Sequence, residues 1–504
     1  MKLELGGKQL KRISKSKALR KLSGRPGRKV SMRSTYFDTP DCALHAAGIS
    51  FRIRKADGKL KQTVKVGTGI HGGISNPVEV ECVVKKSSPD IRKISDRGLR
   101  IQIRKLVSGK KLRPVFKTDI LRRVHRIKRS GAKAELALDK GRVATAKRSA
   151  PIYEAELELV SGDAHALLPM AQKLFARYPV RFATLSKAER GYRLVSAAQQ
   201  GETNKGAVKA VQPELKPAHA VTEAFQLCCR SATDQILGNW YAVLADDDPE
   251  SVHQLRIGLR RLRTALKLFR PAIDSLALRK LAVDLRDAGR IVGELRDCDV
   301  MLADIARPAS AAQQSKAGPR AIEKLLVRRC RKRRKKVRRD LLTKRWNKML
   351  LHLALLPHGA GWQIEDSSGQ AVELARQALD RCWKHVLKRA DKLDRLSIEE
   401  RHHLRKDLKT LRYATEFFKS IFAGEDVEHF IVALKRLQDG FGYLNDVALA
   451  NTLPDIFDAR PKTAASTRQS VGFILGWHAA IAEHEWRDVK DRWLNLNSRP
   501  KFWH

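Results

Sequence analysis

The stretch HQLRIGLRRLRTALKLF at residues 253–269 returns as HHLRKDLKTLRYATEFF at residues 402–418, an offset of 149 residues. In both copies leucines recur three and four residues apart, the spacing of a helix that buries one side. Basic residues recur at the same spacing on the opposite side. We therefore predict two equivalent helices, each with a core face and a cationic face. The cationic faces comprise His253, Arg256, Arg260, Arg263 and Lys267, then His402, Arg405, Lys409 and Arg412.

The offset of 149 residues extends beyond these helices. Asp248, a predicted N-cap, corresponds to Ser397, which opens a predicted capping box. The segment GELRD at 293–297 corresponds to GYLND at 442–446. Strand patterns are missing after residue 217, and long helical patterns replace them. We therefore predict an all-α domain of two four-helix repeats, at about 217–365 and 366–504.

The basic side chains on each cationic face repel one another. Neighbouring like charges on a helix cost a few tenths of a kcal/mol each, so four such steps cost about 1 to 2 kcal/mol per helix. Two explanations stay open at this point. Asp297 and Asp446 could neutralise the faces internally, or an anionic ligand could do so.

Composition favours an anionic partner. The chain of 504 residues has 101 Lys and Arg against 54 Asp and Glu, a net charge of +47. Such an excess predicts nucleic acid, an anionic membrane or a phosphate polymer as partner. The seven cysteines have no metal-ligand spacing, and neither a signal peptide nor a membrane-spanning run is apparent. We expect reduced thiols and a soluble, cytoplasmic protein without membrane partners.

The first 195 residues alternate polar and apolar side chains, as antiparallel strands do. The exposed face of a half-buried sheet would explain this pattern. However, some strands carry only bases on that face, such as Arg52 and Arg54, whereas others carry only acids, such as Glu79 and Glu81. If the sheet closes with these faces inward, bases would bind a phosphate chain and carboxylates a divalent metal.

The same region resembles a CYTH domain. The motifs that carry the resemblance are YFDTPDCALHAAGISFRIRK (36–55), QTVK (62–65), VEVE (78–81), PVFKTDILRR (114–123), ELALDKG (135–141), YEAELEL (153–159) and LSKAERGY (185–192). Members of this family are triphosphate tunnel metalloenzymes, closed antiparallel barrels that hydrolyse phosphoanhydrides with Mg²⁺ or Mn²⁺. The resemblance implies that Arg52, Arg54, Lys65, Arg122, Arg123 and Lys187 bind triphosphate. It implies that Glu4, Glu79, Glu81, Asp139, Glu154 and Glu156 hold the metal.

The first strand departs from the family pattern E-x-E-x-K. The matching positions here are Lys2, Glu4 and Gly6, so one carboxylate and one lysine are missing. A cation in place of a carboxylate weakens metal binding, and the missing lysine removes a phosphate contact. We therefore expect weak metal-dependent hydrolysis of inorganic triphosphate and assign no residue as catalytic.

Residues 196–216 read as a linker, and residues 217–504 resemble a CHAD domain, a helical domain implicated in polyphosphate binding. The order of the two domains resembles a class of bacterial inorganic triphosphatases. The resemblance implies polyphosphate contacts at the cationic-face residues defined above, except Lys267. The basic run at 328–339 either extends this surface or is a solvated helix face.

The sequence therefore predicts an α+β multidomain protein with a barrel at 1–195 that binds tripolyphosphate and a helical domain that binds polyphosphate. Polyphosphate granules are a candidate location. Two alternatives are a nonspecific nucleic-acid-binding protein and a catalytically inactive granule scaffold. Few aromatic residues interrupt the basic faces, which disfavours recognition of bases.

Overall fold

The strands of the first 195 residues form one antiparallel sheet of nine strands, in the order β5-β4-β3-β2-β6-β7-β8-β1-β9. The computed structural model describes residues 1–67, 70, 72–74, 78–129, 131–196, 206–313, 317–362, 369–422, 424–458 and 465–504. The predicted repeat boundary at 365/366 and the linker residues 197–205 lie outside these ranges. The strands are β1 (Lys2–Glu4), β2 (Arg28–Asp38), β3 (Ile49–Ala56), β4 (Lys59–Val66), β5 (Val78–Val84), β6 (Arg113–Arg129), β7 (Ala132–Ala144), β8 (Ser149–Ser161) and β9 (Arg181–Phe182).

The predicted closure of the sheet into a barrel is wrong. Within the described residues, no ladder joins the edge strands β5 and β9. Strand β9 pairs with β1 through only two residues. Beside that short ladder, the backbone N–H of Lys2 donates to the carbonyl of Gly73, 2.7 Å away in the β4–β5 connection. A loop carbonyl therefore takes a hydrogen bond that a closing strand would have needed.

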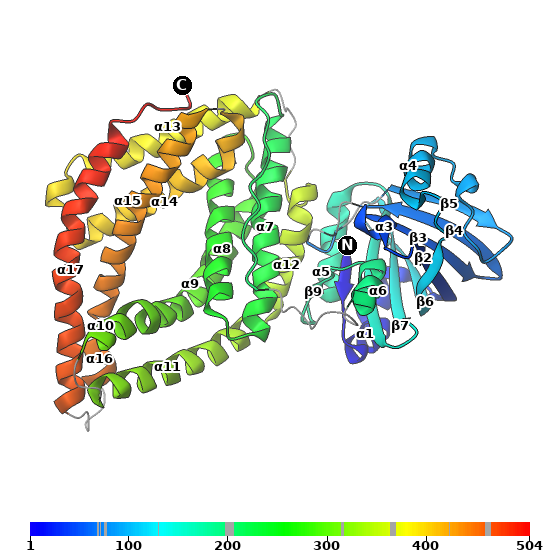
Figure 1. Ribbon diagram of the computed structural model, residues 1–504, viewed down its shortest axis with the longest axis horizontal. Helices are drawn as coiled ribbons and strands as arrows, with labels where there is room; N and C mark the ends of the chain where they lie inside the picture. Colours follow the sequence, from blue (N-terminus) through cyan, green and yellow to red (C-terminus); the bar gives the residue numbers. More distant parts are fainter. Residues whose placement is uncertain are drawn as a thin grey trace. The chain divides into compact units, whose positions relative to one another are not determined.

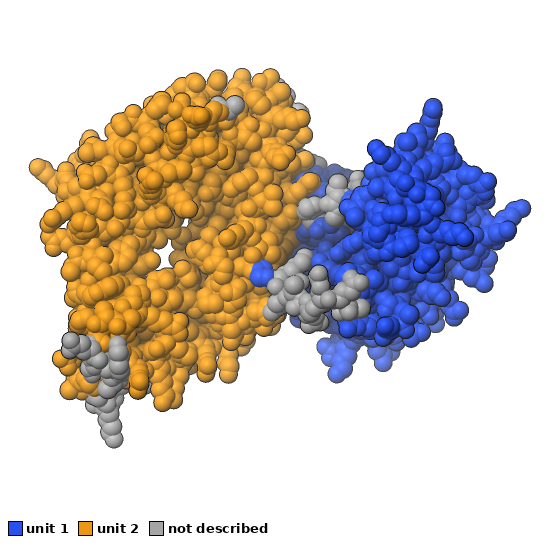
Figure 2. All heavy atoms as spheres, viewed as in Figure 1, with its two compact units in different colours: residues 1–206, 343–360 blue, residues 207–342, 361–504 orange. Residues whose placement is uncertain are grey.

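The chain forms two compact units, which Figure 2 colours separately. Unit 1 comprises residues 1–206 and 343–360, and unit 2 comprises residues 207–342 and 361–504. Helix α12 (Lys344–Leu355), which the predicted helical domain includes, therefore belongs to unit 1. There it packs on α5 (Leu167–Phe175), and Asn347 donates from Nδ2 to the carbonyl of Ala176 at 3.1 Å.

The remaining helices of unit 1 cover the sheet (Figure 1). Helices α3 (Ala43–Ala46) and α4 (Arg97–Val107) share an apolar core with β3 and β4. Helix α6 (Lys187–Ser196) packs on β6 and β7. An added Cβ at Gly191 of α6 would lie 2.1 Å from the ring of Phe116, so glycine permits this close approach. Helices α1 (Gly7–Ser14) and α2 (Lys17–Ser23) complete the unit.

The secondary-structure elements of unit 2 are helices in the part of the chain that the structure describes, apart from one isolated bridge between Ala220 and Gln370 (Figure 1). Asp248 caps the second of its helices and Ser397 forms a capping box with Glu400, as predicted. The helices are α7 (Val221–Ala245), α8 (Pro249–Phe269), α9 (Leu276–Val300), α10 (Arg307–Ala312), α11 (Ala317–Leu341), α13 (Ala371–Ala390), α14 (Ile398–Phe418), α15 (Glu425–Ala450), α16 (Leu453–Asp458) and α17 (Ala465–Asn497). A π-helical turn, Met301–Ala306, joins α9 to α10.

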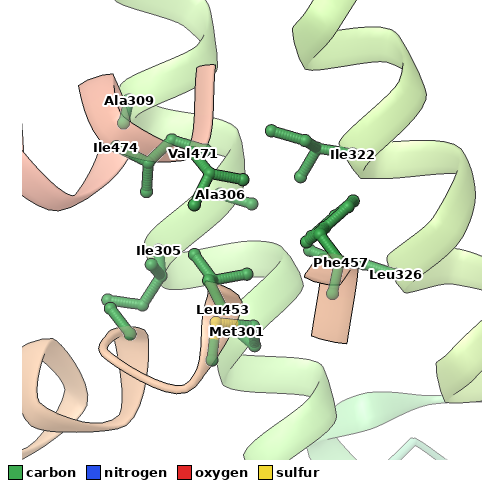
Figure 3. Packing of buried hydrophobic residues seen from close by; sticks show 11 residues of the cluster. Met301, Ile305, Ala306, Ala309, Ile322, Leu326, Leu453, Phe457, Val471 and Ile474 are labelled. Atoms are coloured by element: carbon green, nitrogen blue, oxygen red, sulfur yellow. The ribbon is translucent and has the colours of Figure 1, made fainter. Parts of the chain in front are cut away.

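The starts of four long helices recur after 148 to 150 residues. Helices α7, α8, α9 and α11 begin at 221, 249, 276 and 317, and α13, α14, α15 and α17 begin at 371, 398, 425 and 465. Short helices α10 and α16 each precede the last long helix of a set. One apolar core of this unit is shown in Figure 3, where Met301, Ile322 and Leu453 come from separate segments. No helix among the described residues is both long enough and apolar enough to cross a bilayer.

Candidate functional site

One face of the sheet in unit 1 carries a row of charged side chains. The strand register places Glu4 opposite Glu154, then Asp139, then Arg122 on four neighbouring strands. Lys2 lies opposite Glu156 in the next row. Because side chains of residues two apart point to the same face, the register brings these groups together.

Three carboxylates on this face form an acid cluster, defined as Asp139, Glu154 and Glu156. One oxygen from each lies within 4.8 Å of the others. The side chains of Asp139 and Glu154 are fully buried. Buried oxygen ligands at such spacing match the preference of Mg²⁺ and Mn²⁺ for carboxylates.

Basic side chains already surround the acid cluster. The Nζ atom of Lys187 lies 2.9, 2.6 and 2.7 Å from the three carboxylates, in chain order. Arg122 contacts Asp139 at 2.7 Å and Glu156 at 2.5 Å. Lys2 adds contacts of 3.1 Å to Glu154 and 3.4 Å to Glu156. Each carboxylate of the cluster therefore has at least two cationic neighbours.

The pKa shifts follow from this arrangement. Burial alone would raise the pKa of Asp139, but Lys187 and Arg122 outweigh it and hold that pKa below its usual value. For Glu156, Lys187 and Lys2 overcome burial and place its pKa well below the usual value. Burial disfavours the charged form of Lys187, yet the acid cluster raises its pKa. These groups are therefore ionised at neutral pH.

A second group of charges lies at the other end of the face, on β3, β4 and β5. Arg52 contacts Glu79 at 3.4 Å, and Lys65 contacts the other oxygen of Glu79 at 2.5 Å. Arg54 donates to the hydroxyl of Ser34 at 3.3 Å and has no ion-pair partner in the described part of the chain. Burial, followed by the charge of Arg52, lowers the pKa of Arg54 to about 10. This end of the face holds uncompensated positive charge.

The structure divides the predicted metal ligands. Glu79 and Glu81 lie on β5, far along the strand order from the acid cluster, and Glu81 accepts a hydrogen bond from Thr63 at 2.9 Å. Glu4 is adjacent to the cluster and pairs with Arg190 of α6 at 2.5 Å. Arg190 also reaches Glu154, at 3.5 Å. Sequence reasoning missed Arg190, although its spacing of three residues from Lys187 places both on one helix face.

Arg123 lies on the other face of the sheet. It directly follows Arg122 on β6, so its side chain points away from the acid cluster. It lies instead beside Gly27 and His125. The structure therefore brings Arg122 but not Arg123 to the charged face.

In unit 2, the cationic faces of α8 and α14 come together. The two helices pack against each other. Burial, followed by the charges of Arg405, Arg260, Arg256 and Arg412, lowers the pKa of Lys409 to about 6. Basic groups from both helices therefore surround this lysine. We define the cation cluster as Arg256, Arg260, Arg405, Lys409 and Arg412.

Acidic neighbours neutralise the cation cluster only in part. Arg256 pairs with Asp297 at 2.8 Å, and Arg412 pairs with Glu416 at 3.2 Å. Arg260, Arg405 and Lys409 have no ion-pair partner among the residues described. Burial, followed by Arg256, lowers the pKa of Arg260 to about 10.

The predicted internal partners thus differ in what they do. Asp297 forms an ion pair with Arg256 of the cation cluster, whereas Asp446 accepts a hydrogen bond from the side-chain amide of Asn445. Burial raises the pKa of Asp446, although Arg405 opposes this shift. Internal neutralisation therefore accounts for Arg256 but leaves the centre of the cluster positive.

Three predicted residues lie at the margin of the cation cluster. His402 Nδ1 is 3.0 Å from the side-chain oxygen of Asn445. Burial is the largest cause that lowers the pKa of His253, and the positive charge of Arg296 is the next. Arg263 is exposed, and its charged neighbour is Arg286 of α9. The basic run lies on α11, where Lys324, Arg328, Arg331 and Lys335 are exposed.

Comparison with known proteins finds two family models, one in the first part of the chain and one in the second. Residues 1–192 match the family model of the CYTH domain, and residues 228–453 match that of the CHAD domain. The inorganic triphosphatase of Haemophilus influenzae is 32% identical over 164 residues, which are 32% of this chain and 46% of that protein. An uncharacterized protein of Mycobacterium tuberculosis is 27% identical over 273 residues, 52% of this chain and 50% of that protein. The chain spans about half the length of these curated relatives.

Two solved structures are each similar to more than half of this chain. The CHAD domain from the plant Ricinus communis has a TM-score of 0.49 and 26% identity, covering 59% of this chain and 98% of that one. PptA from Streptomyces chartreusis has a TM-score of 0.45 and 13% identity, covering 55% of this chain and 100% of that one.

Proposed function

Because the chain carries a CYTH domain at residues 1–192 and a CHAD domain at residues 228–453, we propose that it binds inorganic polyphosphate through unit 2 and cleaves inorganic triphosphate weakly in unit 1. The observation that carries the proposal is the cation cluster. Buried like charges are costly to the free protein. Arg260 and Arg405 have no ion-pair partner within the described residues, and they and their neighbours lower the pKa of Lys409 to about 6. A polyanion would remove that cost by supplying the missing charge.

The shape of the ligand follows from the arrangement of the cations. Arg260 lies on α8 and Lys409 on α14, so a ligand that contacts both must bridge two helices. A chain of phosphates offers a negative charge on every unit and needs no base-specific contact. We regard unit 2 as a duplicated set of four long helices in which the two copies contribute to one binding site. The recurring helix starts support this view.

Unit 1 would use its charged face. The acid cluster would hold a divalent cation, Mg²⁺ or Mn²⁺, which when bound would neutralise phosphate charge. Arg52, Arg54 and Lys65 would bind the phosphate chain at the basic end of the face. Lys187 and Arg122 form ion pairs with the acid cluster. With a metal ion bound to the carboxylates, these two side chains would be available to contact phosphate oxygens.

The position of Lys2 explains why hydrolysis would be weak. Its ammonium lies beside Glu154 and Glu156, the oxygens that would hold the metal. A neighbouring positive charge repels a divalent cation. Gly6 offers no side chain to the phosphates, and one charge-assisted contact contributes about 1.5 to 3 kcal/mol. If that contact is tighter in the transition state, its absence slows the reaction about 10- to 100-fold.

Competition binding tests the polyphosphate proposal. The full chain is bound to immobilised long-chain polyphosphate. Free long-chain polyphosphate, RNA or tripolyphosphate is then added as competitor at equal phosphate concentration. We expect the polymer itself to compete at least tenfold better than RNA, with an affinity that falls steeply as salt rises. Equal competition by RNA would favour the nucleic-acid alternative. Absence of binding to polyphosphate at low salt would refute the polyphosphate proposal.

Paired charge reversals test whether one site is formed. Replacing Arg256 and Arg260 by Glu should weaken binding more than about 100-fold, because each charged contact contributes roughly 1.5 to 3 kcal/mol. Replacing Arg405 and Lys409 by Glu should have a similar effect. Arg263→Glu is the matched control, an exposed arginine of α8 outside the cluster, and should cost less than about tenfold. Two variants that each keep half the stoichiometry at full affinity would mean separate sites.

Restoring the first strand tests the hydrolysis proposal. Lys2→Glu combined with Gly6→Lys should raise the metal-dependent release of phosphate from tripolyphosphate about 10- to 100-fold. Gly6 has room for a side chain, since an added Cβ there meets only Gln9, at 3.7 Å. Lys11→Glu, an exposed change on α1, is the control and should leave the rate unchanged.

Three outcomes separate the possibilities for unit 1. Loss of the activity in Glu154→Gln with Glu156→Gln would support the acid cluster as the metal site. A wild-type rate equal to that of the restored variant would show that the departure at Lys2 and Gly6 is irrelevant. If neither protein cleaves tripolyphosphate, unit 1 only binds it. Fluorescence microscopy of the tagged chain would test the proposed presence at polyphosphate granules.

A further inference from the structure

Two cysteines of unit 2 lie side by side on neighbouring helices. Cys298 is near the end of α9, and Cys330 is in the middle of α11. The Sγ atom of Cys330 donates to the backbone carbonyl of Cys298 at 3.3 Å, so the two cysteines are in direct contact. Helices α9 and α11 pack against each other, and this contact is part of their interface.

The pair opens onto a hollow of about 190 Å³. Its apolar wall includes Met301 and Leu326, two members of the core shown in Figure 3. Arg329 and Arg333, which follow Leu326 on α11, also line it. Cys298 is half-buried and is one of the residues that line the hollow.

The surroundings of Cys298 stabilise its thiolate. The adjacent thiol of Cys330 and the charges of Arg329 and Arg333 lower the pKa of Cys298 to about 7, against the opposing effect of burial. All six other cysteines have a raised pKa, for which burial is a cause in each. Because the thiolate is the nucleophile, we expect Cys298 to react fastest of the seven thiols at neutral pH.

We propose that Cys298 and Cys330 form a peroxide-reactive thiol pair, in which Cys298 is oxidised by hydrogen peroxide and Cys330 closes a disulfide with it. The Cys298 thiolate attacks one oxygen of the peroxide, the O–O bond breaks and hydroxide leaves, so that a sulfenic acid forms. The sulfur of Cys330 then attacks the sulfenic sulfur. An S–S bond forms, the S–O bond breaks, and the oxygen leaves as water with the proton of Cys330. The hydroxide released in the first step takes the proton that Cys298 lost on ionisation, so two thiols lose two electrons in total and the peroxide becomes two waters.

Mass spectrometry of the full chain tests this proposal. The protein is treated with hydrogen peroxide, remaining thiols are blocked with N-ethylmaleimide, and peptides are analysed. We expect a peptide cross-linked between Cys298 and Cys330 and blocked thiols at the other five cysteines. Cys382→Ser, a change at a buried cysteine outside the pair, should give the same cross-link. If Cys298 remains fully blocked by the maleimide after peroxide, the proposal is wrong.

Three variants separate the two roles. Cys330→Ser should leave a sulfenic acid at Cys298 that dimedone traps, whereas Cys298→Ser should give neither the cross-link nor a trapped Cys330. Arg329→Gln keeps both thiols but removes one positive charge. A rise of one unit in the pKa of Cys298 would slow its oxidation at pH 7 about fivefold. An unchanged rate in Arg329→Gln, or a trapped sulfenic acid at Cys330 in Cys298→Ser, would overturn the assigned roles.

Discussion

Substitution of Lys409 by methionine separates the stability of unit 2 from its proposed function. Burial and four neighbouring arginines lower the pKa of Lys409 to about 6, whereas a lysine in an unfolded chain titrates near 10.4. Folding at pH 7.5 therefore expels a proton from this side chain. Taken at face value, the shift costs about 4 kcal/mol at that pH. Water contact and rearrangement of neighbours reduce it, so we expect Lys409→Met to raise the free energy of unfolding by about 1 to 2 kcal/mol.

The pH dependence of this gain has a definite sign. A lysine whose pKa is lowered by folding destabilises the protein most at pH values below its folded pKa of about 6, where both states are protonated. The cost shrinks as the pH rises toward the unfolded value. The stabilisation by Lys409→Met, measured by urea unfolding, should therefore be largest near pH 6 and clearly smaller at pH 9.

Lys267→Met provides the control for this experiment. Lys267 is an exposed lysine on the cationic face of α8, and its replacement should change the free energy of unfolding by less than about 0.5 kcal/mol. The same Lys409→Met variant should bind polyphosphate at least tenfold more weakly, since it removes a charged contact. If it is less stable than the wild type at every pH, or if its gain is independent of pH, the buried-charge argument is refuted.

Two further outcomes are expected. Polyphosphate should raise the pKa of Lys409, so its binding at pH 7.5 should take up about one proton. Calorimetry in buffers of different ionisation enthalpy should show this proton uptake in the wild type. Proton uptake of the same size in Lys409→Met would contradict the assignment of the proton to Lys409. Gly191→Ala should lower the free energy of unfolding by about 1 to 3 kcal/mol and slow tripolyphosphate cleavage, because the added Cβ meets Phe116 and displaces the helix that carries Lys187. Gly289→Ala, where an added Cβ meets nothing within 4 Å, should not destabilise, and equal losses in both variants would refute this account.

The sequence pattern predicted the helices well because their determinants are local. The caps at Asp248 and Ser397 use side chains within three residues of the backbone groups that they bond. The apolar spacing in 253–269 and 402–418 fixes which side of each helix is buried. The same reasoning located a mainly antiparallel sheet in the first 195 residues, since period-two alternation is also a local signal.

The features that the sequence pattern did not predict depend on contacts between residues far apart in the chain. Whether edge strands meet depends on the length of β9 and on where the carbonyl of Gly73 lies, and neither is encoded in an alternation pattern. Arg122 and Arg123 are equally basic, and only the register of β6 against β7 decides which of them faces Asp139. In the same way, the helical pattern predicted Arg256 on a cationic face but could not show whether Asp297 would reach it.

Helix α12 sets an order for the synthesis of this protein. The sheet unit draws its last helix from residues 343–360, well over a hundred residues after the rest of that unit ends at 206. A ribosome must therefore complete α7 to α11 before it supplies the helix whose Asn347 bonds to Ala176. Until then the nascent sheet unit keeps the α5 surface uncovered, and a chain that stops anywhere before residue 343 leaves it so. The first domain to emerge is thus among the last to be finished.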